Sequence, residues 1–285
     1  MVERALAWSP GHISGYFHRC VGPRGRVEGS VGGGVVITEG VTVEAVVSRA
    51  PSVRVRSPAP GGSTTVVDGS PPVEYLMDRL GAPAALTTDC HLPIGAGFGL
   101  SAAALLAAGT ALSVLHGLDL SRTEIAAAAH EAEVLFRTGL GDAAAEQGGG
   151  VVVRRGPGVG AEILRMPADE PVWAVSFGPI STPGVLDSDE AMARIRAAFP
   201  QEEPRSLDDL LRLSRCFAEA SGLLTPRVGS ALAACDAAGV PASMTMLGDG
   251  VFAVGHGAEP VLAPFGRVLR LHVATEGFRL LEADP

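Results

Sequence analysis

The chain contains no lysine: all 22 of its lysine-or-arginine positions are arginine. A Walker-type phosphate loop needs a lysine beside the phosphates, and Schiff-base or pyridoxal chemistry needs a lysine amine. A bias towards arginine codons is the simplest explanation of this absence. Whatever its origin, the absence excludes both kinds of site.

Positive charge is scarce, because 31 acidic residues against 22 arginines give a formal net charge of −9. This balance argues against nucleic acid and anionic membranes as partners. Cysteine is scarce too, and Cys20, Cys90, Cys216 and Cys235 form no C-x-x-C pair. The pattern indicates neither a zinc site nor a redox motif, and we expect isolated buried thiols in a reducing cytoplasm.

Long apolar segments are also missing. The opening residues, MVERALAWSP, contain no apolar signal-peptide core. The most apolar run, residues 100–115, is mostly alanine, lacks aromatic flanks and falls short of the roughly 20 residues of a membrane span. We therefore expect it to be a buried helix. At 285 residues the chain is long enough for one large domain or two smaller ones, and its composition, 47% hydrophobic and 19% charged, allows it to bury a core.

Strand-like and helix-like patterns alternate irregularly along the chain. Strands are expected at residues 4–8, 41–48, 52–56, 84–92, 148–155, 172–177 and 267–274. Helices are expected at residues 72–80, 100–116, 121–137, 188–198, 206–221 and 226–238. A hairpin is expected around GDG at 248–250, and a loop over the glycine-rich stretch 22–34. This order predicts an α+β protein of two packed domains, residues 1–167 and 168–285, joined near the sequence MPADEP.

The sequence HLPIGAGFGL at residues 91–100 places three glycines in front of the predicted buried helix. Glycines allow backbone amides to approach an anion closely, and a helix N-terminus adds unpaired N–H groups and a positive dipole end. The pattern predicts a phosphate site that needs no lysine, although a tight strand-to-helix turn would look the same. A dinucleotide fingerprint is a weaker alternative, because Pro93 interrupts the strand that it needs and Asp119 follows a helix.

The string PIGAGFGLSAA resembles the P-x-x-x-G-L-G-S-S-A-A signature of the GHMP kinases. The matching positions are Pro93, Gly97, Gly99, Ser101, Ala102 and Ala103, whereas Phe98 replaces a leucine and Leu100 the first serine. HEAEVLFRTGLGDAAAEQGGG supplies the acidic helix and glycine-flanked aspartate of that family, and MTMLGDGVFAVG its C-terminal glycine turn. These strings, with SPGHISGYF near the start, are most similar to the archaeal branch that phosphorylates pantoate for coenzyme A synthesis.

The resemblance implies an α+β, two-domain GHMP kinase fold with a glycine-rich phosphate loop leading into a buried helix. It also implies ATP and Mg²⁺ as cofactors and a cytoplasmic homodimer. The residues implied to bind ATP are Pro93, Gly95, Ala96, Gly97, Phe98, Gly99, Leu100, Ser101 and Ala102. Magnesium is expected on Ser101 and on one of two glutamates, Glu133 in preference to Glu131. A capping role for Ser101 and a solvated acidic face for the other glutamate are the simpler alternatives.

Asp142 is expected to orient or deprotonate the acceptor hydroxyl, although it could merely cap a short helix. A substrate carboxylate suits an arginine fork, and Arg154 or Arg155 could provide it. Adjacent strand residues face opposite sides, so at most one of the two enters the pocket. His12 and Ser14 are candidates for contacts with the substrate, because the opening segment lies beside the acceptor in the family.

Three other functions stay open at this point. The chain could be a GHMP kinase with a different small acceptor, of the homoserine or mevalonate type. It could be a nucleotide-binding regulator that has lost catalysis, although Ser101, the acidic helix and Asp142 are all retained. A dinucleotide-dependent oxidoreductase is the remaining alternative.

Overall fold

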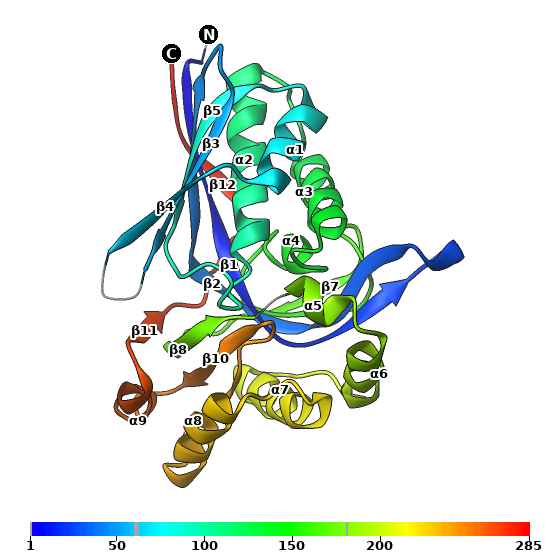
Figure 1. Ribbon diagram of the computed structural model, residues 1–285, viewed down its shortest axis with the longest axis vertical. Helices are drawn as coiled ribbons and strands as arrows, with labels where there is room; N and C mark the ends of the chain where they lie inside the picture. Colours follow the sequence, from blue (N-terminus) through cyan, green and yellow to red (C-terminus); the bar gives the residue numbers. More distant parts are fainter. Residues whose placement is uncertain (1, 60–62, 181) are drawn as a thin grey trace.

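The computed structural model describes residues 2–59, 63–180 and 182–285, and builds them around two β-sheets (Figure 1). The larger sheet has the strand order β12-β1-β2-β5-β3-β4, and β2 also pairs with β6, which pairs with β7. Its strands are β1 (Arg4–Val21), β2 (Val27–Val47), β3 (Ser52–Pro58), β4 (Thr64–Asp68), β5 (Ala84–Cys90), β6 (Val151–Arg154), β7 (Ile163–Met166) and β12 (Arg279–Asp284). The first and last strands pair side by side, so the two ends of the chain lie together (Figure 1).

Three helices cover one face of this sheet: α1 (Pro71–Leu80), α2 (Leu100–His116) and α3 (Arg122–Phe136) (Figure 1). Helix α2 lies against β1 and β2, and 14 of its residues are buried, as expected for its alanine-rich sequence. Ser121 caps α3 in a capping box with Glu124. The structure thus confirms these three helices to within a residue or two at each end.

The glycine-rich stretch at 22–34 is not the loop that the sequence predicts, because β1 and β2 form a long antiparallel ribbon through most of it. Small residues on β2 leave room for the large side chains of β1. A Cβ atom at Gly33 would lie 2.5 Å from the Tyr16 hydroxyl, and one at Gly34 would lie 2.3 Å from Nε2 of His12. Glycine here permits close packing between strands. The prediction of a loop was wrong because it took these glycines as turn residues.

The second sheet has the order β11-β8-β10-β9. Its strands are β8 (Val172–Pro179), β9 (Ala242–Met244), β10 (Gly248–Val254) and β11 (Val268–Leu271). The helices of this part are α5 (Thr182–Leu186), α6 (Asp189–Ala198), α7 (Leu207–Ser221), α8 (Pro226–Ala237) and α9 (Ala258–Leu262). The predicted hairpin exists, but its turn is at residues 245–247, and GDG already belongs to β10.

The observed architecture is α+β, as predicted. Short or exposed elements escaped the sequence patterns: β4, β7, β12, α5 and α9. β12 carries the end of the chain back to the first sheet, and the domain boundary at residues 167 and 168 stays a prediction. Cys90 and Cys235 are buried as expected, Cys20 is half-buried, and Cys216 is exposed against expectation. None of the helices in the described residues has the length and apolarity needed to span a membrane.

Candidate active site

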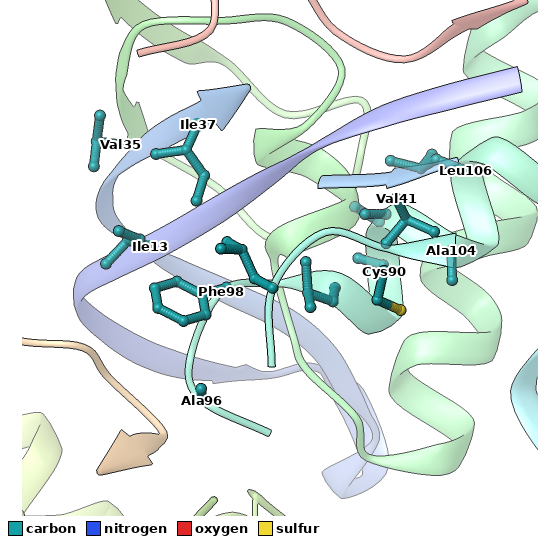
Figure 2. Close-up of a cluster of buried hydrophobic side chains, with 14 of the residues drawn as sticks. Ile13, Val35, Ile37, Val41, Cys90, Ala96, Phe98, Ala104 and Leu106 are labelled. Carbon is teal, nitrogen blue, oxygen red and sulfur yellow. The ribbon is translucent and has the colours of Figure 1, made fainter. Parts of the chain in front are cut away.

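The loop between β5 and α2 turns on three glycines with left-handed backbone angles. Their φ values are +76° at Gly95, +82° at Gly97 and +68° at Gly99, a region that other residues enter only at a cost. The side chains between them, Ala96 and Phe98, are each 1% exposed and point into the core. Figure 2 shows both in that buried cluster with residues of β1 and β2. Between these glycines the loop therefore keeps its side chains inside and turns its backbone towards a cavity.

This loop leads directly into α2, whose N-cap is Gly99 and has no side-chain cap. The first N–H groups of α2 are thus left for a ligand, which is the arrangement of a helix N-terminal anion site. The turn between β9 and β10 supports the loop from the other side. A Cβ atom at Gly97 would lie 2.9 Å from the carbonyl oxygen of Met246, and one at Gly248 would lie 2.1 Å from that of Ala96.

A cavity of about 370 Å³ lies beside this loop. Its lining comes from the glycine loop with the start of α2, the β1–β2 ribbon, the stretch from Arg137 to Asp142, Arg154 of β6 (Val151–Arg154), residues near α5, and the β9–β10 turn. Its polar lining side chains include those of Ser14, Ser30, Ser101, Asp142 and Arg154.

Asp142 begins the four-residue helix α4 (Asp142–Ala145) and is held from behind by His12 of β1. The His12 Nδ1 and Asp142 Oδ1 atoms are 2.6 Å apart, and the histidine is fully buried. Nη1 of Arg154 lies 3.5 Å from His12 Nε2. Because arginine only donates, Nε2 accepts and the His12 proton sits on Nδ1, where it donates to Asp142.

Charge states at this pair are set by burial and by the neighbouring groups. Burial lowers the pKa of His12 although Asp142 opposes the shift, so the imidazole is neutral. Burial alone would raise the pKa of Asp142, but the hydrogen bond from His12 and the charge of Arg154 lower it below its ordinary value. Asp142 is therefore ionised at neutral pH, and its side chain is 21% exposed and lines the cavity. This suits a group that accepts a proton or orients a hydroxyl.

Arg154 is a buried cation, 2% exposed, and among the described residues its side chain forms no ion pair with a carboxylate. Its contacts with His12 Nε2 and Ser30 Oγ are both 3.5 Å long, and its Nε atom has no hydrogen-bond partner. The guanidinium lies directly under Gly141, because a Cβ atom there would be 2.7 Å from Nε. A buried cation in this state calls for an anionic ligand from the cavity.

The two candidate metal glutamates lie on different sides of α3. Glu133 is 1% exposed and accepts a hydrogen bond of 3.2 Å from the Asp142 backbone N–H. Its Oε1 atom and Oδ2 of Asp142 lie 2.3 Å and 2.7 Å from the position of a Cβ atom on Gly139, so the two carboxylates converge beneath the cavity. Burial and the charge of Asp142 raise the pKa of Glu133.

Converging carboxylate oxygens and the Ser101 hydroxyl are the hard donors that Mg²⁺ prefers. A divalent cation would also relieve the repulsion between Glu133 and Asp142. By their chemistry the Ser101 hydroxyl and these two carboxylates fit magnesium, but Glu133 does not itself line the cavity. Among the described residues there is also no group of three or more acidic, histidine or cysteine side chains that could hold a metal by itself. Glu131 does not belong to this set: it is exposed and binds the Tyr75 hydroxyl at 2.7 Å and Nε of Arg79 at 3.4 Å, both from α1.

Comparison with known proteins agrees with this geometry. Residues 71–150 match the family described as "GHMP kinases N terminal domain". The "Pantoate kinase" of Methanospirillum hungatei is 43% identical over 98% of this chain and 97% of that protein. The chain belongs to the GHMP kinase family. The "Pantoate kinase" of Thermococcus kodakarensis is 31% identical over 87% of this chain and 86% of that protein.

Solved structures of the family share the fold over nearly the whole chain. A structure named "Phosphotransferase related to CoA biosynthesis pathway" has a TM-score of 0.77 and 25% identity, with 98% of each chain covered. A homoserine kinase from Cytophaga hutchinsonii has a TM-score of 0.65 and 16% identity, covering 99% of this chain and 98% of that one. The predicted α+β fold of the GHMP kinases is confirmed, and the structure builds it from two sheets.

The cavity of this GHMP kinase brings most of the predicted site residues together and leaves some out. Lining it are Ser14, Gly95, Gly97, Phe98, Gly99, Leu100, Ser101, Ala102, Asp142 and Arg154. Pro93 and Ala96 do not line it, and Phe98 and Leu100 have buried side chains, so only their backbones are available to a nucleotide. His12 stands behind Asp142 and not in the cavity, which corrects its predicted direct contact with substrate.

Two alternatives that the sequence left open are decided by the structure. Arg155 faces away from the cavity and pairs with Glu162 and Glu203, because strand neighbours point to opposite faces. Asp142 does not cap α4, since the N-cap is Gly141 and no side-chain cap is present. The placements of Glu131 and Arg155 remove both residues from the candidate metal and substrate ligands.

Sequence reasoning missed two polar residues of this site. Ser30 lay in the stretch predicted to be a loop, and pairing with β1 turns it towards the cavity. Glu146 is fully buried with neither carboxyl oxygen hydrogen-bonded, and its Oε1 lies 2.5 Å from the position of a Cβ atom on Gly99. Burial raises its pKa well above the ordinary value, and the charges of Asp142 and Glu133 add to that. Its place one turn after Asp142 on a helical segment was the available signal.

Proposed function

We propose that this protein transfers the γ-phosphoryl group of ATP to the 4-hydroxyl of pantoate, giving 4-phosphopantoate and ADP for coenzyme A synthesis. The observation that carries the proposal is the unpaired, buried guanidinium of Arg154 in the same cavity as Asp142. One group suits a carboxylate and the other suits a hydroxyl, so the pair fits a short hydroxy acid. The names of the two pantoate kinases similar over most of this chain support the same acceptor.

The glycine loop and the N-terminus of α2 supply the phosphate-binding end. Backbone N–H groups there donate to the β- and γ-phosphates without intervening side chains. Ser101 and Glu133 would hold Mg²⁺, which when bound neutralises charge on the transferred phosphoryl group. Phosphoryl transfer depends mainly on position and charge stabilisation, and this end of the cavity provides both without lysine.

Asp142 and Arg154 act on the acceptor. Arg154 binds the carboxylate and so fixes the distance of the hydroxyl from the loop. Asp142 orients the hydroxyl and takes its proton while the hydroxyl oxygen bonds to the γ-phosphorus and the bond from phosphorus to the ADP oxygen breaks. Neutral His12 keeps the Asp142 carboxylate in one orientation through its Nδ1–H, and stays behind it throughout the transfer.

A coupled ADP-release assay across pantoate, homoserine, mevalonate and galactose tests the proposal. Pantoate should give the highest kcat/KM, and phosphate should appear on its 4-hydroxyl by NMR. A clearly higher kcat/KM for another acceptor would contradict pantoate as the substrate, while the assignment to the GHMP kinase family would still hold. Absence of ADP release with every acceptor would favour a nucleotide-binding regulator. We also propose that the enzyme is a homodimer in the cytoplasm. The mass of the protein in solution tests the dimer.

A further inference from the structure

The acceptor end of the cavity has an apolar wall that phosphoryl transfer itself does not require. Phe17 of β1 and Leu186 at the end of α5 both line the cavity, and each is only 4% exposed. A wall of this kind contributes to binding only when the ligand presents apolar surface to it.

The contacts around Arg19 fix where this wall stands. Phe17 and Arg19 lie on the same face of β1, two residues apart, and Arg19 is the cross-strand partner of Ser30. Nη1 of Arg19 donates to the carbonyl oxygen of Leu186 at 2.7 Å. Leu186 is therefore held over the face of the ribbon that carries Phe17 and Ser30. Ser30 in turn lies 3.5 Å from Arg154, the proposed carboxylate ligand.

A second arginine ties the other side of the wall to the catalytic segment. Arg137 lines the cavity five residues before Asp142, and its Nη1 lies 2.7 Å from Oδ2 of Asp187. The end of α5 is thus anchored both to β1 and to the stretch that carries Asp142. Leu186 therefore lines the same cavity as Arg154, the proposed carboxylate ligand, and as Asp142, the group proposed to act on the hydroxyl.

We propose that Phe17 and Leu186 form a subsite for a branched apolar carbon lying between the carboxylate and the acceptor hydroxyl. This inference rests on the proposed function and makes it more specific, because pantoate carries two methyl groups on the carbon next to its CH₂OH group. A straight-chain hydroxy acid leaves the wall without a partner and loses the corresponding contacts. In this arrangement Arg154 binds the carboxylate of any short hydroxy acid. Phe17 and Leu186 then favour those acids that carry two methyl groups.

The test compares pantoate with 2,4-dihydroxybutanoate, which lacks only the two methyl groups. One apolar group in a pocket changes kcat/KM by roughly 10–200-fold. In the wild type, kcat/KM should therefore be at least about tenfold higher for pantoate than for 2,4-dihydroxybutanoate. Leu186→Ala should lower this ratio at least about fivefold, mainly by reducing kcat/KM for pantoate. Leu186→Met, which conserves volume, should keep most of the ratio.

A control lies in the same cavity beside the glycine loop. Ile94→Ala removes an apolar group there that is 51% exposed, against 4% for Leu186, and should leave the ratio between the two acids unchanged, whatever it does to turnover. Should Leu186→Ala fail to fold by its thermal melt, Leu186→Val should give a smaller drop in the same direction. An equal loss on both acids in the folded variant would overturn the subsite. Failure of the wild type to phosphorylate pantoate would instead overturn the proposed function and the subsite with it.

Discussion

At the scale of single residues, Asp142 has three neighbours with different effects. His12 donates to one carboxylate oxygen, Arg154 supplies positive charge nearby, and the backbone N–H of Asp142 itself is held by Glu133. None of these contacts comes from the helix that Asp142 begins. A change at Asp142 should therefore affect the acceptor hydroxyl more than the local fold.

Replacing Asp142 by asparagine should mainly lower kcat, with a smaller change in the KM for ATP. The amide is nearly isosteric but cannot take a proton and has no charge with which to orient the hydroxyl. General-base contributions of this kind are about 10²–10⁴-fold. Steady-state kinetics with varied ATP and varied acceptor measure both constants. A fall in kcat of less than about tenfold would shift the mechanism to electrostatic stabilisation by loop and metal alone. Circular dichroism of the variant serves as the control for folding.

Glu146 raises a different issue, because a buried carboxyl without hydrogen bonds is costly when ionised. Its pKa in the folded protein is raised well above the ordinary 4.5, by burial first and then by Asp142 and Glu133. Arg154 opposes the shift. A group with a raised folded-state pKa contributes stability that is fully present below the unfolded pKa. That stability is lost as the pH rises from 4.5 through the folded-state value.

Glu146→Gln should therefore flatten the fall in stability above pH 4.5. Glutamine cannot ionise, so the variant gains on the wild type as the pH rises, whatever the two stabilities are at low pH. Melting temperatures of both proteins from pH 4 to pH 8, without nucleotide or magnesium, measure the difference. Parallel curves over that range would show that Glu146 ionises without cost, and would contradict the burial argument.

At the scale of elements, the glycine loop is the part whose shape depends most on residue type. Gly97 has a φ of +82°, and a Cβ atom there would lie within 2.9 Å of a backbone oxygen of the β9–β10 turn. Gly117, at the end of α2, has a φ of +61° with nothing within 4 Å of its Cβ position. A substitution at either glycine brings conformational strain, but only one at Gly97 also brings steric overlap, so comparing the two separates these effects.

Gly97→Ala should therefore cost more stability than Gly117→Ala. Left-handed backbone costs a residue with a side chain about 1–2 kcal/mol, and only Gly97 adds the overlap with the turn. A displaced loop should also lower kcat/KM for ATP by about tenfold or more, since phosphate position decides the rate. Urea unfolding and kinetics with ATP measure the two effects. Equal stabilities of the two variants would mean that the β9–β10 turn shifts at little energetic cost to make room for the added methyl group.

At the scale of the whole molecule, the cavity joins segments from both sheets. Its walls come from β1, β2, the residues after β5, the catalytic stretch, and the region from β8 to α5 with the β9–β10 turn. A nucleotide bound here contacts parts of the chain that are far apart in sequence. Ligand binding should consequently stabilise the entire protein and not one element alone.

ATP with Mg²⁺ should raise the melting temperature by about 3 °C or more at concentrations far above Kd, since 100-fold excess is worth about 2.7 kcal/mol. Chelation of magnesium with EDTA should remove most of this gain, and NAD should give none. Glu133→Gln should shrink the magnesium-dependent part because it removes an oxygen ligand of a hard cation. Glu131→Gln is the matched control on the same helix and should behave as the wild type. An unchanged magnesium response in the Glu133 variant would remove that residue from the metal site.

The sequence by itself determined the features that rest on local pattern. The glycine loop, the buried helix after it and the capping box of α3 follow from residues close together in the chain, whose propensities tertiary packing does not override. The lack of lysine excluded whole classes of chemistry without any structure. The sequence motifs identified the family, because each motif is a short run of consecutive residues that specifies a local backbone conformation.

Only the tertiary structure decided which side chains act together. Strand alternation limits Arg154 and Arg155 to opposite faces, but only the fold places Arg154 under Gly141 and Arg155 against Glu203. Helical geometry separates Glu131 from Glu133, yet only packing against α1 takes the first away from the site. His12 lies 130 residues from Asp142 in sequence and touches it because β1 runs beside the glycine loop and α4. Such contacts depend on which distant elements pack against each face, and no local pattern carries that information.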